Sequence, residues 1–201
     1  MKDVTRGQLA LMVLPRSSLG GLPVKGWVER RAGFETNAES AATSLDPRLT
    51  RASLTTEGRL TGYALGYSVR RAKLEDALQR GSGPIGVATE VSLYRDTAGT
   101  AAEMTRAIRD SRTLIGKTIK GGAKLDHAAT FPVAQVGDAA VGFKLRVGID
   151  GVHVCFTQVN FRSGRLLARV VETRVDAKNV DPTVTALARE LDGRINGILT
   201  N

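Results

Sequence analysis

The chain has 201 residues, 42% of them hydrophobic and 4% aromatic, and a formal net charge of +9. This length and composition support one core, built mainly from aliphatic side chains. The single cysteine, Cys155, excludes an internal disulfide and a cysteine-based zinc site. No apolar run approaches the about 18 residues that span a bilayer, and the pattern of a signal peptide is absent.

The N-terminal part of the chain is rich in turn-forming residues. Leucines, glycines, serines and prolines alternate between Leu14 and Pro23. We therefore expect residues 1–24 to be an irregular segment and residues 25–201 to be a single α+β domain. Within that domain, residues 27–34 are predicted to form a short strand, and Asn37 is expected to cap a small helix.

Two strands and a helix are predicted in the middle of the chain. Apolar residues alternate with small or polar ones over residues 58–70 and 85–93, which is strand periodicity. The polar stretch 73–83 ends in Gly-Ser-Gly-Pro, so we expect a long mobile loop between paired strands. Asp96 is expected to cap a helix that runs from residue 97 to about residue 115 and lies on the sheet.

The last third of the chain has the clearest pattern. Alternation predicts three strands, joined by tight turns at Asp150–Gly151 and Ser163–Gly164, that form an antiparallel meander. Asp181–Pro182 then begins a final helix that packs on the sheet. Because the elements do not alternate regularly between strand and helix, we predict an α+β fold with an antiparallel sheet and flanking helices.

Several short motifs, spread over most of the chain, carry a family resemblance. They are Gly-Leu-Pro and Gly-Trp within residues 21–27, and the segments 58–63, 136–139, 160–164 and 187–195. Together they resemble bacterial exported proteins with a PsbP-like α/β/α sandwich. The resemblance rests on packing and turn motifs, and it implies an extracytoplasmic, often lipid-anchored accessory protein. It supplies no functional residue to carry over to this chain.

The chain contains no recognisable catalytic or metal-binding motif. Gly116–Lys117–Thr118 is not a phosphate-binding P-loop, because Ser111 stands where that motif needs glycine and a helix is predicted before it. Asp126 and His127 would point to opposite faces of a strand, and the spacing of His127 and His153 defines no metal pair. We therefore predict a non-enzyme without a cofactor, in which these three residues are the first to test for activity.

The positive charge falls into small, separated clusters. Each cluster is interrupted by apolar or acidic residues, so ordinary solvated surface is the favoured interpretation over a polyanion site. The candidate polyanion contacts are Arg70, Arg71, Lys73, Lys117, Lys120 and Lys124.

Two functions from different classes remain. The first is a non-catalytic extracytoplasmic accessory or ligand-binding domain with an unknown envelope partner or ligand, provided that an export signal has been removed. Its cleft is expected between the sheet and the 73–83 loop. The second is an intracellular protein that binds nucleic acid through dispersed Arg and Lys, with Arg106, Arg109 and Arg112 on the predicted helix as its best signal. We favour the first interpretation and leave the oligomeric state open.

Overall fold

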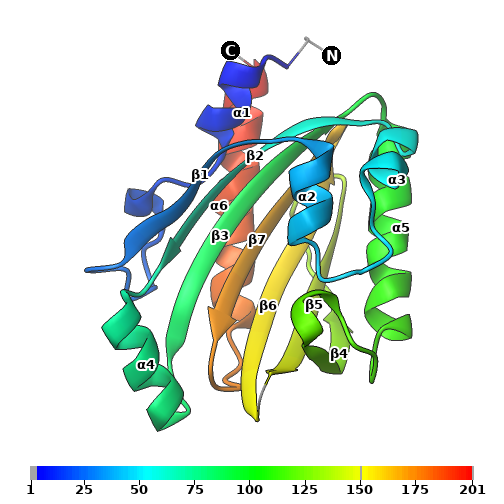
Figure 1. Ribbon diagram of the computed structural model, residues 1–201. Coiled ribbons are helices and arrows are strands. Elements are labelled where there is room, and N and C mark those ends of the chain that lie inside the picture. The colour runs from blue at the N-terminus through cyan, green and yellow to red at the C-terminus, as the bar shows by residue number, and fades with distance from the viewer. Residues whose placement is uncertain (1–3, 150, 201) are drawn as a thin grey trace.

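The computed structural model describes residues 4–149 and 151–200. Their seven strands form one sheet with the order β1-β2-β3-β7-β6-β5-β4, and every neighbouring pair is antiparallel (Figure 1). The strands are β1 (Val28–Glu35), β2 (Arg59–Ser68), β3 (Pro84–Tyr94), β4 (Lys124–Phe131), β5 (Ala139–Ile149), β6 (Val152–Ser163) and β7 (Leu166–Arg174). The predicted α+β class with an antiparallel sheet is confirmed.

Helices flank both faces of this sheet. They are α1 (Arg6–Met12), α2 (Asn37–Thr43), α3 (Arg51–Thr56), α4 (Arg71–Arg80), α5 (Thr97–Thr113) and α6 (Asp181–Thr200). Within the described residues, no helix is both long enough and apolar enough to cross a membrane.

The C-terminal meander and packing helix are confirmed. Strands β5, β6 and β7 pair in sequence, and Gly151 and Gly164 adopt positive φ angles of 81° and 57° in the two turns. Asp150, the other residue of the first predicted turn, lies outside the described residues. Helix α6 begins at Asp181 and crosses the sheet, as expected from its capping residues and apolar stripe.

The main core lies between one face of the sheet and helices α1 and α6. Alternate residues of the central strands point to this face, including Val91, Val159 and Val170, none of which is exposed. Helix α6 meets them with a continuous apolar stripe made of Val184, Leu187, Ala188, Leu191 and Ile195. This layer excludes water from one side of the sheet and leaves the other side for a second set of helices.

The N-terminal segment is more ordered than the sequence predicts. Residues 6–12 form helix α1, whose start is closed by a capping box between Thr5 and Gln8. Leu9 and Met12 are completely buried in the main core. The expectation of an irregular segment was wrong here, because two buried side chains and one cap stabilise a helix that is too short to show a clear periodicity.

The stretch expected to be a mobile loop is helix α4. Two ion pairs at i,i+4 spacing, Arg71 with Glu75 and Asp76 with Arg80, support its exposed side. Ala77 is buried, and Gly81 ends the helix in the left-handed conformation at φ 62°. The prediction was wrong because a polar composition is typical of a loop, whereas these charges have the i,i+4 spacing of a helix.

Three smaller features also differ from expectation. The cap of α2 is Thr36, whereas the side chain of Asn37 donates to the carbonyl of Arg59 at 2.9 Å. Helix α3 and strand β4 were not predicted at all. Strand β4 pairs with β5 at the edge of the sheet, and a break in register between Leu125 and His127 interrupts its alternation. That irregularity hides the strand from a periodicity argument.

Candidate functional site

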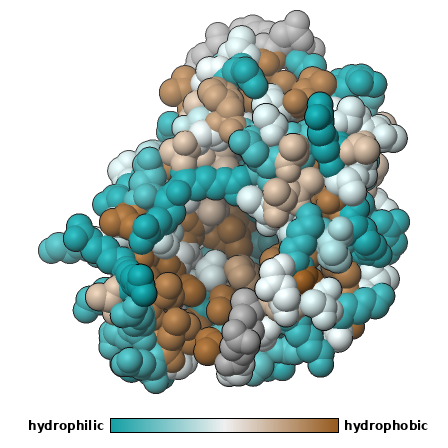
Figure 2. Space-filling model, in the orientation of Figure 1, coloured by the Kyte–Doolittle hydropathy of each residue, from teal (hydrophilic) through white to brown (hydrophobic). Residues whose placement is uncertain are grey.

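The second face of the sheet carries a cavity of about 310 Å³. Helix α5 covers this face beside β4 and β6, and α2 and α3 cover it beside β2. The middle of the face is left open between them, and Figure 2 shows it as a hollow with a largely apolar floor and hydrophilic residues at its border. The cavity is lined by α2, the 44–49 segment, α5 and the central strands.

Five alternating charges cross the polar end of this cavity, and we call them the ion row: Arg31, Glu35, Arg59, Glu90 and Arg169. Arg59 lies at its centre, with Nη2 3.1 Å from Glu35 Oε2 and 3.5 Å from Glu90 Oε1. Arg31 pairs with the other oxygen of Glu35, and Arg169 Nη1 lies 3.6 Å from Glu90 Oε2. The row is therefore continuous from β1 to β7.

Strand alternation and register place these charges. Glu90 on β3 lies directly opposite Arg169 on β7, so the two side chains stand on the same face. Arg59 also donates through Nε to the hydroxyl of Ser92 at 3.2 Å. Burial acts to raise the pKa of Glu90, but Arg169 and Arg59 hold that pKa below its ordinary value. Glu90 is therefore ionised at neutral pH and balances the arginines on both sides.

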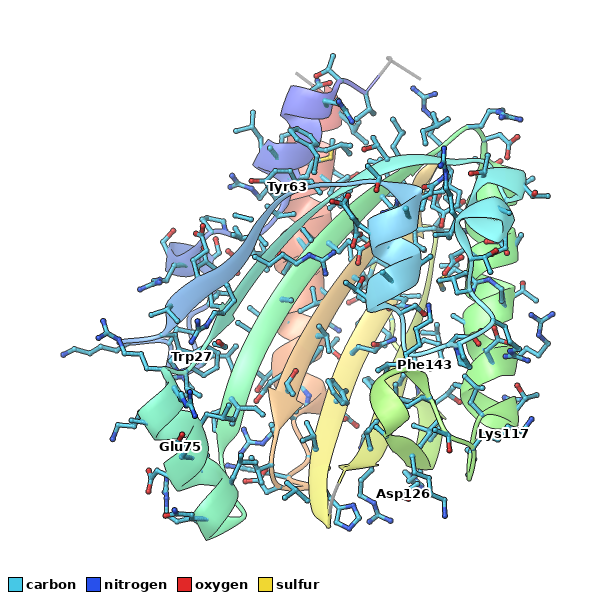
Figure 3. The ribbon with its side chains drawn as sticks, viewed as in Figure 1. Trp27, Tyr63, Glu75, Lys117, Asp126 and Phe143 are labelled. Carbon is cyan, nitrogen blue, oxygen red and sulfur yellow. The ribbon has the colours of Figure 1, made fainter. Side chains whose placement is uncertain are left out.

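The other end of the cavity is apolar. Phe143 is buried there, and it projects from β5 on the side of the sheet that α5 covers (Figure 3). Seven aliphatic and aromatic side chains line this end: Leu45, Leu114, Ile119, Leu125, Phe143, Leu145 and Phe156. Most of them belong to a small second hydrophobic cluster, separate from the main core.

A second group of charges connects α5 to the chain between α2 and β2. We call it the wall cluster, and it consists of Arg48, Glu57, Glu103, Arg106 and Asp110. Arg106 contacts three acids: Glu57 Oε1 at 3.0 Å, Asp110 at 3.8 Å, and Glu103. Arg48 of the 44–49 segment contacts Asp110 at 2.9 Å. Burial and a hydrogen bond with Glu103 raise the pKa of Glu57 above its ordinary value. These contacts fix the cover of the cavity to α5.

The candidate polyanion contacts form two groups that the fold keeps apart. Arg70, Arg71 and Lys73 lie at the start of α4, beyond the ends of β2 and β3. The second group, Lys117, Lys120 and Lys124, follows α5 and leads into β4 at the far edge of the sheet. Figure 3 shows Glu75 of α4 and Lys117 on opposite sides of the molecule.

Lys120 has a structural contact of its own. Its Nζ donates to the carbonyl of Leu49 at 3.3 Å and also to the carbonyl of Ala41. It therefore ties the turn after α5 to the segment that covers the cavity.

The structure pairs Asp126 with His153 instead of His127. Asp126 Oδ2 lies 3.1 Å from His153 Nδ1, and the His153 side chain is 55% exposed. Neither residue lines the cavity. In the described part of the chain, no three His, Cys, Asp or Glu side chains gather as metal ligands. The pair therefore lies apart from the site that the cavity defines.

Sequence reasoning missed the cavity, because its lining comes from segments scattered between residues 31 and 171. One signal was available. Glu90 is the one charged residue of β3, and a charge within a mostly buried strand calls for an opposite charge or a polar space beside it.

Comparison with family models gives no match, and neither does comparison with curated protein sequences. Among solved structures, the chain is similar to the crystal structure of the extracellular domain of PknH from Mycobacterium tuberculosis. The TM-score is 0.60 at 10% sequence identity, and the match covers 100% of this chain and 99% of that one. This similarity shows a shared fold. The PsbP-like resemblance and a lipid anchor remain predictions.

Proposed function

We propose that this chain is a non-catalytic extracytoplasmic domain that binds a small ligand in the cavity between α5 and the central strands. The cavity carries the proposal, because it combines an apolar end with a few fixed polar groups, as small-molecule sites do. Its volume of about 310 Å³ is at the lower end of the range for such sites, about 300–1,000 Å³. This location replaces the cleft expected beside residues 73–83.

The state of the charged groups supports binding over catalysis. The carboxylates of the ion row and the wall cluster are paired with arginines, and the low pKa of Glu90 makes it a poor proton donor at neutral pH. Of the described residues that line the cavity, none is histidine or cysteine. Burial raises the pKa of the Cys155 thiol, which disfavours its reactive thiolate form.

An uncharged fluorescent probe tests whether the cavity admits a ligand. N-phenyl-1-naphthylamine is expected to bind the protein with enhanced fluorescence. Ala88 lines the cavity floor, so Ala88→Trp should fill the space and remove binding. The matched control is Ala72→Trp on the exposed surface of α4, which should bind the probe normally. Equal probe binding by both variants, or none by the wild type, would contradict the proposal.

The extracytoplasmic location rests on the resemblance to exported proteins and on the fold shared with an extracellular domain. Fractionation of cells that express the complete native gene tests it separately. Antibody detection in the membrane fraction or the medium is the expected result. Recovery in the cytosol alone would refute the location, but it would leave binding in the cavity to the probe experiment.

A further inference from the structure

We infer that the ligand is a single-chain aliphatic carboxylate, whose carboxylate group binds at the ion row and whose chain lies against the apolar end of the cavity. The inference rests on the proposed function and adds the chemical class of the ligand. It follows from the charge balance of the ion row, the exposure of its ends, and the shape and lining of the cavity.

The ion row has one positive charge in excess. Its three arginines alternate with two glutamates, so the row begins and ends with a guanidinium group. The central side chains of Arg59 and Glu35 are almost completely buried, at 1% and 3% exposure. The terminal side chains of Arg31 and Arg169 are 42% and 37% exposed. An incoming group therefore meets arginines, and an anion completes the alternation.

One nitrogen of the Arg169 guanidinium group is available to donate hydrogen bonds to a ligand. Its Nε donates to Asn160 Oδ1 at 3.3 Å, and its Nη1 lies 3.6 Å from Glu90. Its Nη2 makes no hydrogen bond to any residue that the structure describes. A guanidinium group with free donors binds a carboxylate through charge-assisted hydrogen bonds, and the planar geometry favours two of them. Arg169 is therefore the residue that we expect to contact the carboxylate most directly.

The acids of the wall cluster would favour a ligand with a cationic head group, and they are the strongest argument against a carboxylate. Within the cluster, Arg106 is shared by Glu57, Glu103 and Asp110. However, Asp110 also binds Arg48 and Arg109, so two further arginines offset the negative charge of this cluster. Each acid of the wall thus has an arginine partner within the protein, whereas the ion row ends in exposed arginines.

The cavity has room for one chain. Apolar side chains continue from the ion row towards Phe143, Leu145 and Phe156 within the same space. A volume of about 310 Å³ fits one small ligand, so a lipid with two long chains would leave much of its apolar surface in water.

Competition with the uncharged probe tests the class of ligand. The competitors are dodecanoate, dodecanol, dodecylammonium and acetate, each below its micelle concentration. Dodecanoate should displace N-phenyl-1-naphthylamine at least tenfold more strongly than dodecanol, and acetate should not displace it. Arg169→Gln should weaken dodecanoate about tenfold or more without weakening dodecanol, since it removes a charge-assisted contact. Arg169→Lys should give an intermediate loss.

Two further variants separate the head group from the chain. Leu145→Asn should weaken dodecanoate and dodecanol alike, because both chains contact the apolar end. Arg71→Gln removes an exposed arginine of α4 and should change neither affinity. Far-UV circular dichroism and urea unfolding show that each variant is folded, independently of probe binding.

The outcomes distinguish this inference from the proposed function. If dodecanol or dodecylammonium competes as well as dodecanoate, the carboxylate is wrong, although the cavity still binds apolar ligands. The same conclusion follows if Arg169→Gln leaves the dodecanoate affinity unchanged. If the probe itself does not bind the wild type, the proposed function fails and the inference fails with it.

Discussion

Arg59 brings a full charge into a nearly dry environment, with 1% of its side chain exposed. Its partner Glu35 is 3% exposed. The guanidinium group of Arg59 donates further hydrogen bonds to Ser92 and Asn37. A buried ion pair of this kind gives little net stability, but removal of one partner leaves the other charged and desolvated. Arg59 therefore holds the ion row together, and its removal should lower the free energy of unfolding strongly.

We predict that Arg59→Met lowers the free energy of unfolding by about 3 kcal/mol, because Glu35 then keeps only Arg31 as a charged partner, beside the hydroxyl of Thr43. Urea denaturation at pH 7 measures this change. Arg71→Met is the matched control, since the Arg71 side chain is 90% exposed and its pair with Glu75 should contribute less than about 0.5 kcal/mol. If both variants change the free energy of unfolding by a similarly small amount, the ion row does not contribute to the stability of the fold in this way.

Asp176 gives a pH-dependent contribution to stability. Hydrogen bonds from Arg174, of which the Nε bond is 2.6 Å, and one from the backbone of Gly83 hold the pKa of Asp176 at about 2. In the unfolded chain an aspartate has a pKa of about 3.9. The folded state therefore gains stability from ionised Asp176 above pH about 4, and it loses this gain as the pH falls towards 2.

Asp176→Asn is accordingly expected to reduce stability at pH 7, and the difference from the wild type should shrink between pH 4 and pH 2. Urea denaturation of both proteins across this range measures the difference. If the gap stays constant with pH, the ionised carboxylate is not the source of the stability.

Helix α4 shows how a single glycine can define the end of an element. Gly81 ends the helix with φ 62°, and a Cβ atom placed on it would meet nothing within 4 Å. The constraint is therefore conformational and not steric. Gly193 lies inside α6 with equally open surroundings, but in the middle of a helix.

The same substitution should consequently have opposite effects at these two positions. Gly81→Ala is expected to destabilise the protein by about 1 kcal/mol, because alanine is strained in the left-handed region. Gly193→Ala should stabilise it by about 0.5–1 kcal/mol through helix propensity. Thermal or urea unfolding decides the signs. Loss of stability in both variants would mean that contacts other than backbone conformation dominate.

The sequence predicts some elements far better than others, for physical reasons. The β5–β6–β7 meander and α6 combine strict periodicity with turn or capping residues, so independent signals agree. Helix α4 lacks a strong apolar stripe and depends on charge spacing and one buried alanine. Helix α1 is stabilised by tertiary burial of Leu9 and Met12, which no local pattern reveals.

The cavity is less predictable than any single element. Glu90 and Arg169 are far apart along the chain and become neighbours only through the β3–β7 register. The sequence therefore leads only to the expectation of a binding module, and the location of the cavity requires the three-dimensional structure.

At the scale of the whole molecule, the candidate polyanion contacts lie in two separated groups. The α4 group and the group after α5 lie at opposite sides of the fold, and Lys120 is held by backbone carbonyls of the cover segment. Binding to a nucleic acid through many phosphates needs cations that converge on one backbone. The separation of these two groups therefore argues against the nucleic-acid alternative.

We therefore expect labelled single- and double-stranded DNA to bind weakly at 20 mM salt and not to bind at 200 mM salt, because few phosphate contacts can form together. Fluorescence anisotropy measures both conditions. Tight binding that persists at 200 mM salt would favour the nucleic-acid function. In that case, substitution of Lys117 and Lys124 in one variant, and of Arg70 and Lys73 in another, would locate the surface.

The pairing of β3 with β7 at the centre of the sheet also controls when the fold can be completed. Pro84 pairs with Arg174 and Leu93 pairs with Leu166, so β3 must wait for a strand made much later during synthesis. Such distant pairing is a slow step, because a long loop has to close before the contacts repay its entropy. Until β7 leaves the ribosome, the apolar β3 has an unpaired edge. A growing or truncated chain that ends before residue 166 is therefore a natural client for chaperones and a ready seed for aggregation.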